Sequence, residues 1–346
     1  MQLEVDKDAA GVMGRKRFNE AYKEWRNRAR KYDRDSIVVE AIRALGDTPR
    51  DPVGQLASAP WVTLLLVKWA CQDRYVDGRR LPAITRPELE DLRQKLWELP
   101  DRVQRDGRDG MPPRLFMRQL IRPQLGFQRR LTKSFTREAA LLAAQGEDYP
   151  LRRLFRAKTG FDVVEFIDLS LGTFAAISEG RRVIPGTWFS SPEPACPANV
   201  VAGFRSAMGR TLPELVSFCR SLPDAKRKVA SECFEFPALT RYPFLRTEGG
   251  MTCWHPMVFY RGLESLVHSV LGEEGQTYMD RFGRLFERHV LGEARRVPAP
   301  FFGEETLRGW IAVGSQVPDG LLSFPGCNVF VESKAGLFDE SVMVVG

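Results

Sequence analysis

A few residues near the end of the chain have the types and spacing that could bind a metal ion and hydrolyse a phosphodiester. Asp319 follows Pro318, and Glu332, Ser333 and Lys334 begin thirteen residues further on. Residues two apart on a β-strand point to the same face, so Glu332 and Lys334 would share one face. If Asp319 lies on an antiparallel neighbouring strand, its carboxylate can reach that of Glu332. Two carboxylates suffice for Mg²⁺, which takes oxygen ligands and retains several waters.

Such a site would have a definite chemistry. A metal-bound water loses a proton readily and can attack phosphorus, while the metal and the Lys334 ammonium stabilise charge that develops on the phosphoryl oxygens. Lys334 is the only lysine after Lys228, in a stretch that otherwise uses Arg. The alternative interpretation is a simple ion pair of Glu332 and Lys334 in an unrelated α+β domain.

The elements that must position these residues are predicted from residue periodicity. Residues 273–294 have helical spacing, and three short apolar runs separated by Gly and Pro indicate strands at 310–313, 320–324 and 329–331. The second and third strands, joined through residues 323–327, would carry Asp319 and Glu332.

This arrangement resembles the PD-(D/E)xK nuclease superfamily. The resemblance rests on the helical segment 283–290 with its acidic Glu287, on Pro318-Asp319, and on Glu332-Ser333-Lys334. It implies that Asp319, Glu332 and the Ser333 carbonyl bind Mg²⁺, with Mn²⁺ as a substitute. It also implies that Lys334 orients or activates the attacking water and that Glu287 supports a second metal or its water shell, which makes Lys334, Glu287, Asp319 and Glu332 the catalytic set.

The resemblance covers residues 272–346. Only twelve residues follow Lys334, too few for the second helix and final strand of the superfamily core. We therefore expect a truncated restriction-endonuclease-like α/β core, or one that another subunit completes.

A second feature is a basic stripe, defined as the seven basic residues between positions 111 and 137, where no acidic residue occurs. Between residues 101 and 160, fourteen basic and six acidic residues give a net charge of +8, against +7 for the whole chain. Such a surface suits a nucleic acid backbone, although a solvated face or contact with an acidic partner are alternatives. The stripe consists of Arg114, Arg118, Arg122, Arg129, Arg130, Lys133 and Arg137.

The remaining organisation follows from helical patterning and proline content. We predict a helical domain at residues 1–184 that includes one amphipathic helix from 15 to 45, and a Pro-rich linker at 185–198. A connector at 199–271 would contain further helices, one of them at 224–233, and a hairpin around residues 248–250. The nuclease-like core would occupy 272–346.

Composition narrows the function classes. The 346 residues are 43% hydrophobic and 27% charged, as in a folded globular protein. No Gly-rich phosphate loop or dinucleotide fingerprint is present, and the three histidines form no metal-binding pair. The six cysteines have no CxxC spacing and predict reduced thiols of a cytoplasmic protein, with neither an export signal nor a membrane partner.

The sequence thus predicts an α+β protein with a mainly helical N-terminal region and a C-terminal α/β core. The expected function is Mg²⁺-dependent endonuclease activity on nucleic acid, DNA before RNA. The helical region would bind substrate or a trigger or partner protein. A large helical region before such a core resembles the architecture of prokaryotic nucleases of antiviral defence. Two alternatives stay open: a catalytically inactive nucleic-acid-binding or adaptor protein, and an interaction protein whose basic stripe docks an acidic partner.

Overall fold

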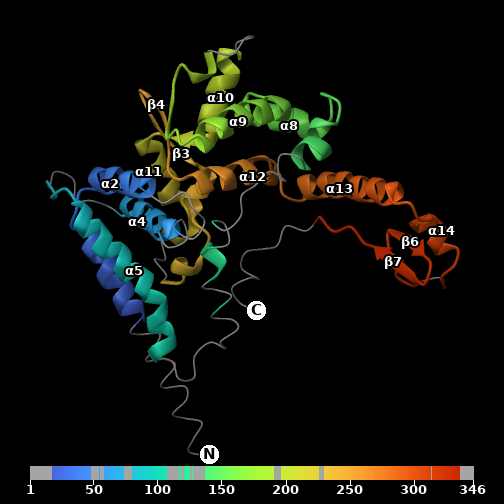
Figure 1. Ribbon diagram of the computed structural model, residues 1–346, viewed down its shortest axis with the longest axis horizontal. Coiled ribbons are helices and arrows are strands. Elements are labelled where there is room, and N and C mark those ends of the chain that lie inside the picture. Colours follow the sequence, from blue (N-terminus) through green and yellow to red (C-terminus); the bar gives the residue numbers. More distant parts are fainter. Residues whose placement is uncertain are drawn as a thin grey trace, which may run out of the picture. The chain divides into compact units, whose positions relative to one another are not determined.

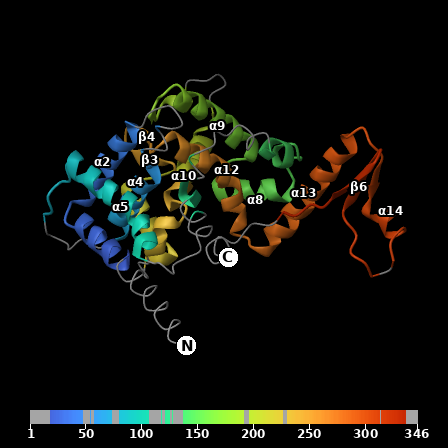
Figure 2. The same ribbon diagram turned by 60° about the horizontal axis from the view of Figure 1, so that its bottom comes forward.

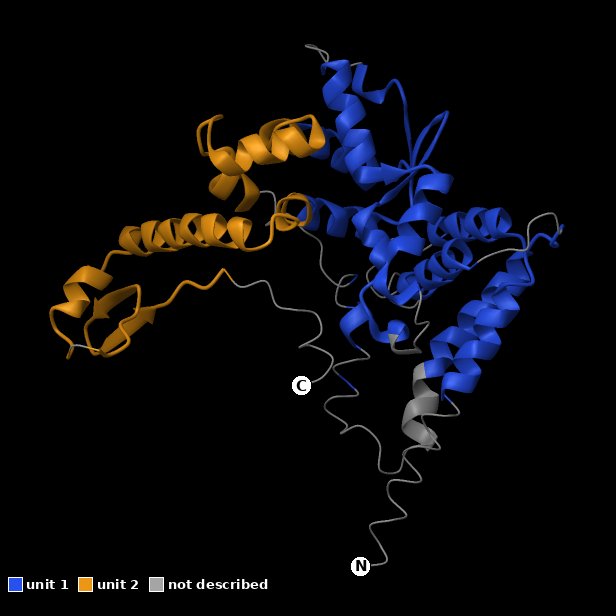
Figure 3. Ribbon diagram, turned by 180° about the vertical axis from the view of Figure 1, so that it is seen from behind, with its two compact units in different colours: residues 1–132, 168–266 blue, residues 133–167, 267–346 orange. Residues whose placement is uncertain are grey.

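The chain folds as two compact units, each made of two separate segments of sequence. The computed structural model describes residues 18–47, 54, 58–73, 80–106, 117, 121–124, 127, 137–190, 196–225, 230–312 and 314–335. Unit 1 comprises residues 1–132 and 168–266, and unit 2 comprises residues 133–167 and 267–346 (Figure 3). These bounds differ from the expected division at a Pro-rich linker.

Unit 1 begins with helices that surround one apolar helix. Residues 18–29 are helical and are followed by α2 (Arg34–Gly46), α4 (Pro60–Gln72) and α5 (Arg86–Asp106). The three labelled helices lie side by side in Figures 1 and 2. Almost every residue of α4 is buried, including its one lysine, Lys68. The apolar run at 61–71 therefore forms the centre of the helical core.

The single helix predicted over residues 15–45 is instead two helices. The chain leaves the first helix after residue 29, and the Asp33 carboxylate accepts a hydrogen bond of 2.9 Å from the Ser36 backbone N–H. That contact satisfies one of the backbone donors that a helix start leaves open. The capping residue thus begins a second helix inside the amphipathic pattern, where periodicity alone predicts one continuous helix.

A four-stranded sheet completes unit 1. Its strands are β1 (Val183–Pro185), β2 (Gly209–Arg210), β3 (Phe244–Thr247) and β4 (Gly250–Cys253), in the order β1-β4-β3-β2. The antiparallel β3–β4 pair is the predicted hairpin. The surrounding helices and turns are α10 (Ala198–Met208), α11 (Leu212–Ser221), η2 (Trp188–Ser190), η3 (Pro223–Ala225), η4 (Ala230–Phe234) and η5 (Ala238–Arg241).

The Pro-rich segment 185–198 belongs to this unit and does not link two units. Pro185 is the last residue of β1 and pairs with Gly250 of β4, while Phe189 is buried. Gly250 has φ +145°, and a Cβ there would lie 2.2 Å from the Ile184 carbonyl oxygen. Only glycine lets β1 approach β4 this closely. Pro185 ends the edge strand β1, where a missing N–H costs little.

The helix predicted over residues 224–233 is absent from the described part of that segment. Two short 3₁₀ turns, η3 and η4, stand at its ends and turn Asp224 and Glu232 toward Lys68 on α4. The attraction between these charges determines the local backbone conformation. Because it acts between residues far apart in sequence, helical periodicity does not predict it.

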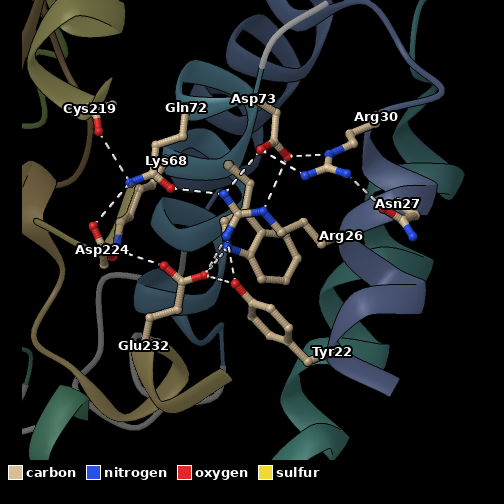
Figure 4. Close-up of polar contacts among 11 residues, drawn as sticks. Tyr22, Arg26, Asn27, Arg30, Lys68, Gln72, Asp73, Cys219, Asp224 and Glu232 are labelled. Carbon is tan, nitrogen blue, oxygen red and sulfur yellow. Dashed lines mark hydrogen bonds and ion pairs between the residues drawn. The ribbon is translucent and has the colours of Figure 1, made fainter. Parts of the chain in front are cut away.

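A buried network of charged side chains joins the first helix, α4 and the turns after α11 (Figure 4). Glu232 Oε1 accepts hydrogen bonds from Arg26 Nη1 at 2.9 Å, from Trp69 Nε1 at 2.6 Å and from the Tyr22 hydroxyl. Glu232 Oε2 accepts from Lys68 Nζ at 2.8 Å. Four donors therefore converge on one carboxylate whose residue is only 4% exposed.

Two further carboxylates complete the network. Arg26 also pairs with Asp73 at 3.1 Å, and Arg30 Nε donates to Asp73 Oδ2 at 2.7 Å. Lys68 pairs with Asp224. Three cations thus face three carboxylates, as burial of charge requires. Burial opposes ionisation of Asp73, but the hydrogen bonds from Arg30 and Arg26 outweigh it and lower the pKa of its carboxyl to about 2.

Unit 2 contains a helical part and a small sheet. The helical part holds η1 (Ala139–Ala143), α8 (Pro150–Thr159) and α13 (Gln276–Arg296), which contacts both of the others. The sheet is antiparallel, with β5 (Phe301–Gly303), β6 (Gly320–Phe324) and β7 (Cys327–Val331) in that order, and α14 (Glu304–Arg308) follows β5. The boundary between the units falls within α9 (Val163–Ser178) and α12 (Pro256–Gly272).

The predicted strands of this region are confirmed at β6 and β7, and the strand expected at 310–313 is wrong over its described residues, 310–312. Residues 310 and 311 form a turn and a bend after α14, and the strand that pairs with β6 is β5. Trp310 packs its ring on Phe302 at 4.8 Å between centroids while staying 59% exposed. Trp310 therefore packs against β5 and does not belong to a strand.

None of the helices in the described part of the chain has the length and apolar character that a membrane crossing requires. The architecture as a whole is α+β, with helices predominating before the C-terminal sheet, as the sequence predicts.

Replacing Glu232 by Ala would leave Arg26 and Lys68 with one carboxylate partner each in a buried setting. We expect Glu232→Ala to lower the free energy of unfolding by about 3–5 kcal/mol, measured by urea denaturation. The exposed Glu248→Ala is the control and should stay within about 0.5 kcal/mol of wild type. A loss below about 1 kcal/mol for Glu232→Ala would contradict the central role of this carboxylate.

Acid titration tests the Asp73 contacts separately. Because the pKa of Asp73 is lower in the folded chain, its stabilisation is complete above its ordinary value of 3.8 and is lost as pH falls toward about 2. The shift corresponds to roughly 2 kcal/mol. In urea melts between pH 6 and 2, Asp73→Asn should be destabilised at pH 6 and show a shallower loss below pH 4. An unchanged slope would show that Asp73 does not contribute.

Candidate functional site

The sheet of unit 2 places Asp319 and Glu332 at the same end of one hairpin. The β6–β7 ladder runs from Phe324 paired with Cys327 to Gly320 paired with Val331. Asp319 directly precedes the first residue of β6 and Glu332 directly follows the last residue of β7. The expected antiparallel arrangement of the two strands is therefore present.

Local sequence explains why the hairpin forms in this register. Pro325 and Gly326 occupy the turn, and Gly326 has φ +86°. Pro followed by a left-handed Gly is the preferred pair for the centre of such a turn. Leu321 and Leu322 are buried on β6, which anchors the hairpin, while β7 is exposed along most of its length. A one-residue shift would reverse the faces of these side chains.

Ser333 holds the Asp319 carboxylate in place. The Ser333 backbone N–H and its hydroxyl both donate to Asp319 Oδ2, each at 2.7 Å. Among the described residues, no hydrogen bond reaches Asp319 Oδ1. Ser333 thus contacts Asp319 through donors, whereas the superfamily resemblance implies a role for its carbonyl.

Glu332 and Lys334 form an open ion pair next to this contact. Lys334 Nζ lies 3.6 Å from Glu332 Oε1, and the two side chains are 79% and 51% exposed, respectively. A pair this exposed adds little to stability because water screens it. Both charged groups are consequently accessible to a ligand.

The structure places Glu287 in different surroundings. It lies on α13 and borders a cavity of about 430 Å³ together with Arg281, Arg284, Arg288 and the start of α8. The next turn of α13 does reach the hairpin, because a Cβ on Gly320 would lie 3.5 Å from Leu291 Cδ2. No contact among the described residues joins Glu287 to Asp319 or Glu332. The described residues hold no cluster of three or more His, Cys, Asp or Glu that could bind a metal ion.

Metal binding at the hairpin would therefore depend on two carboxylates. The donors present are hard oxygens with one carboxylate held by Ser333, which fits Mg²⁺ better than a softer metal because Mg²⁺ completes its shell with water.

Most of the basic stripe lies outside the described residues, namely Arg114, Arg118, Arg129, Arg130 and Lys133. Arg137 is exposed, as a phosphate contact requires. Arg122 is only 9% exposed, so its assignment to a solvent-facing stripe is corrected. Burial raises the pKa of the Glu235 carboxyl, and the charge of Arg122 offsets part of that rise.

Sequence reasoning missed a cavity in unit 1. About 320 Å³ in volume, it lies against α4, α5 and the segment that contains Glu232 and Glu235. Its lining comes from stretches far apart in sequence, each with an unremarkable local pattern. The single lysine inside the apolar run of α4 was the one available signal, since a buried cation requires partners.

Comparison of the chain with protein-family models, with curated proteins and with solved structures gives no match. The interpretation of the hairpin therefore rests on its residues and their geometry.

Asp319 has a structural effect that can be measured apart from any activity. Replacing it by Ala removes the acceptor of the Ser333 N–H, so we expect faster amide hydrogen exchange at Ser333, by roughly 5–10-fold for the loss of about 1 kcal/mol. Asp319→Asn keeps an acceptor oxygen and should preserve most of the protection, while Glu305→Ala on α14 is the control. Equal exchange in all variants would contradict the contact.

Proposed function

We propose that this chain is a metal-dependent nuclease that hydrolyses phosphodiester bonds of nucleic acid, DNA before RNA. The observation that carries the proposal is the position of Asp319 and Glu332 at the same end of the antiparallel β6–β7 pair, with Lys334 beside Glu332. Carboxylate oxygens suit hydrated Mg²⁺, and a neighbouring ammonium suits a phosphate.

Each residue has a separate task in this proposal. Asp319 and Glu332 would hold the cation, which when bound supplies Lewis-acid chemistry and a more acidic water. Ser333 positions Asp319 by donating two hydrogen bonds to one oxygen, which leaves the other oxygen for a ligand. Lys334, with its charged end in solvent, would bind a non-bridging phosphate oxygen and stabilise charge that develops there.

Glu287 has a weaker place in the proposal than Asp319 and Glu332. It stands among three arginines on α13, and those arginines offer positive charge to a phosphate backbone. The proposal therefore rests on Asp319, Glu332 and Lys334, and it does not give Glu287 the metal-supporting role that the superfamily resemblance implies.

Cleavage assays on the full chain test this function. Supercoiled plasmid, single-stranded DNA and RNA are incubated with Mg²⁺, Mn²⁺ or EDTA. We expect metal-dependent cleavage that falls by at least about 100-fold in Asp319→Asn, Glu332→Gln and Lys334→Met, and that Glu305→Gln preserves. Cleavage that persists in all three variants would refute the site.

The same samples distinguish the alternative of an inactive nucleic-acid-binding protein. That alternative predicts no cleavage by wild type, together with an affinity for nucleic acid that falls steeply as salt rises. Binding that is absent at low salt would exclude both functions.

A further inference from the structure

The cavity in unit 1 has apolar walls and an acidic end. Trp61 on α4 and Trp97 on α5 line it with ring centroids 5.8 Å apart, and Phe236 also contributes to the lining. Trp61 is buried, whereas Trp97 is 45% exposed and marks where the cavity meets solvent. The volume of about 320 Å³ lies within the range of small-molecule sites, about 300–1,000 Å³.

Two charged residues in the lining are already fully engaged. Lys68 Nζ pairs with Asp224 and with Glu232, and Glu232 accepts four hydrogen bonds in the buried network (Figure 4). These groups form a fixed wall, so neither offers a free charge to a ligand.

Glu235 differs from both. Its backbone N–H donates to the Glu232 carbonyl oxygen at 3.2 Å, which places it one turn further along the same wall. No hydrogen bond or ion pair joins its carboxyl to another residue in the part of the chain that the structure describes. The side chain is half-buried, so its carboxyl is partly removed from water and accepts no described hydrogen bond, an arrangement that costs free energy.

The electrostatic surroundings of Glu235 favour a further cationic partner for its carboxylate. Burial raises the pKa of its carboxyl, Lys68 opposes the rise, Asp224 and Glu232 add to it, and Arg122 opposes it again. Lys68 is itself held by two carboxylates, so it does not neutralise a third. A cation bound next to Glu235 would stabilise the ionised form of its carboxyl.

We propose that this cavity binds an organic ammonium ion with an aromatic body. The ammonium pairs with Glu235, and the body lies against Trp61, Trp97 and Phe236. Ring faces attract a cation as well as apolar carbon, which favours this class over a neutral one. An anion would be repelled by Glu232 and Glu235, and a neutral molecule would leave Glu235 without a charged ligand. This site is independent of the proposed nuclease function.

The test uses three probes that share one ring system. Tryptamine carries an ammonium, indole-3-ethanol is its neutral counterpart, and indole-3-acetate is an anion. Binding to the full chain is measured by isothermal titration calorimetry at pH 7. We expect tryptamine to bind with a Kd below about 1 mM, indole-3-ethanol to bind at least about 10-fold more weakly, and indole-3-acetate not to bind.

Variants separate the charge from the aromatic wall. Glu235→Gln keeps the shape of the side chain and should weaken tryptamine by about 10-fold while leaving indole-3-ethanol unchanged. Trp97→Ala, at an exposed position that tolerates truncation, should weaken both. Glu248→Gln, on the exposed turn between β3 and β4, is the matched control and should change neither.

Thermal unfolding verifies that each variant is folded before it is titrated. Three results would overturn the proposal: no tryptamine binding up to about 10 mM, equal affinity for tryptamine and indole-3-ethanol, or a tryptamine preference that survives in Glu235→Gln. Because none of these variants touches unit 2, nuclease activity should be the same in all of them, and its absence would not bear on the cavity.

Discussion

The Glu232 carboxylate is the interaction on which unit 1 depends. It collects donors from the first helix and from α4, and it is supplied by a short turn more than 150 residues away in sequence. Buried cations on α4 and on the helix at residues 18–29 would be costly without it, because low-polarity surroundings penalise an unpaired charge. The same carboxylate fixes the wall of the cavity, so core stability and the candidate ligand site share one group.

The charged residues at the β6–β7 hairpin of unit 2 are arranged differently from this buried network. Asp319, Glu332 and Lys334 lie at the open end of a hairpin, where water screens them and their pairing adds little stability. Charged groups that contribute little to folding remain available for a ligand. The contrast is physical: the charges around Glu232 are buried and mutually satisfied, whereas Glu332 and Lys334 at the hairpin are exposed and Asp319 is restrained by Ser333.

Local signals predicted the parts of the fold that local chemistry controls. The hairpin at β3–β4, the Pro-Gly turn between β6 and β7 and the buried helix α4 all follow from turn residues and apolar runs. Errors arose where long-range contacts outweigh local pattern. Residues 310–312 turn back onto Phe302 instead of forming a strand, and the Pro-rich segment pairs with β4 because Gly250 allows close approach.

The sequence by itself determined that Asp319 and Glu332 flank one hairpin, since spacing along two short strands and a two-residue turn are properties of neighbouring residues. Only the tertiary structure decided that Glu287 stands apart from that pair, that Arg122 is buried, and that Lys68, Glu232 and Glu235 border one cavity. The reason is that burial and charge pairing depend on which distant segments pack together, and local sequence periodicity does not specify that packing.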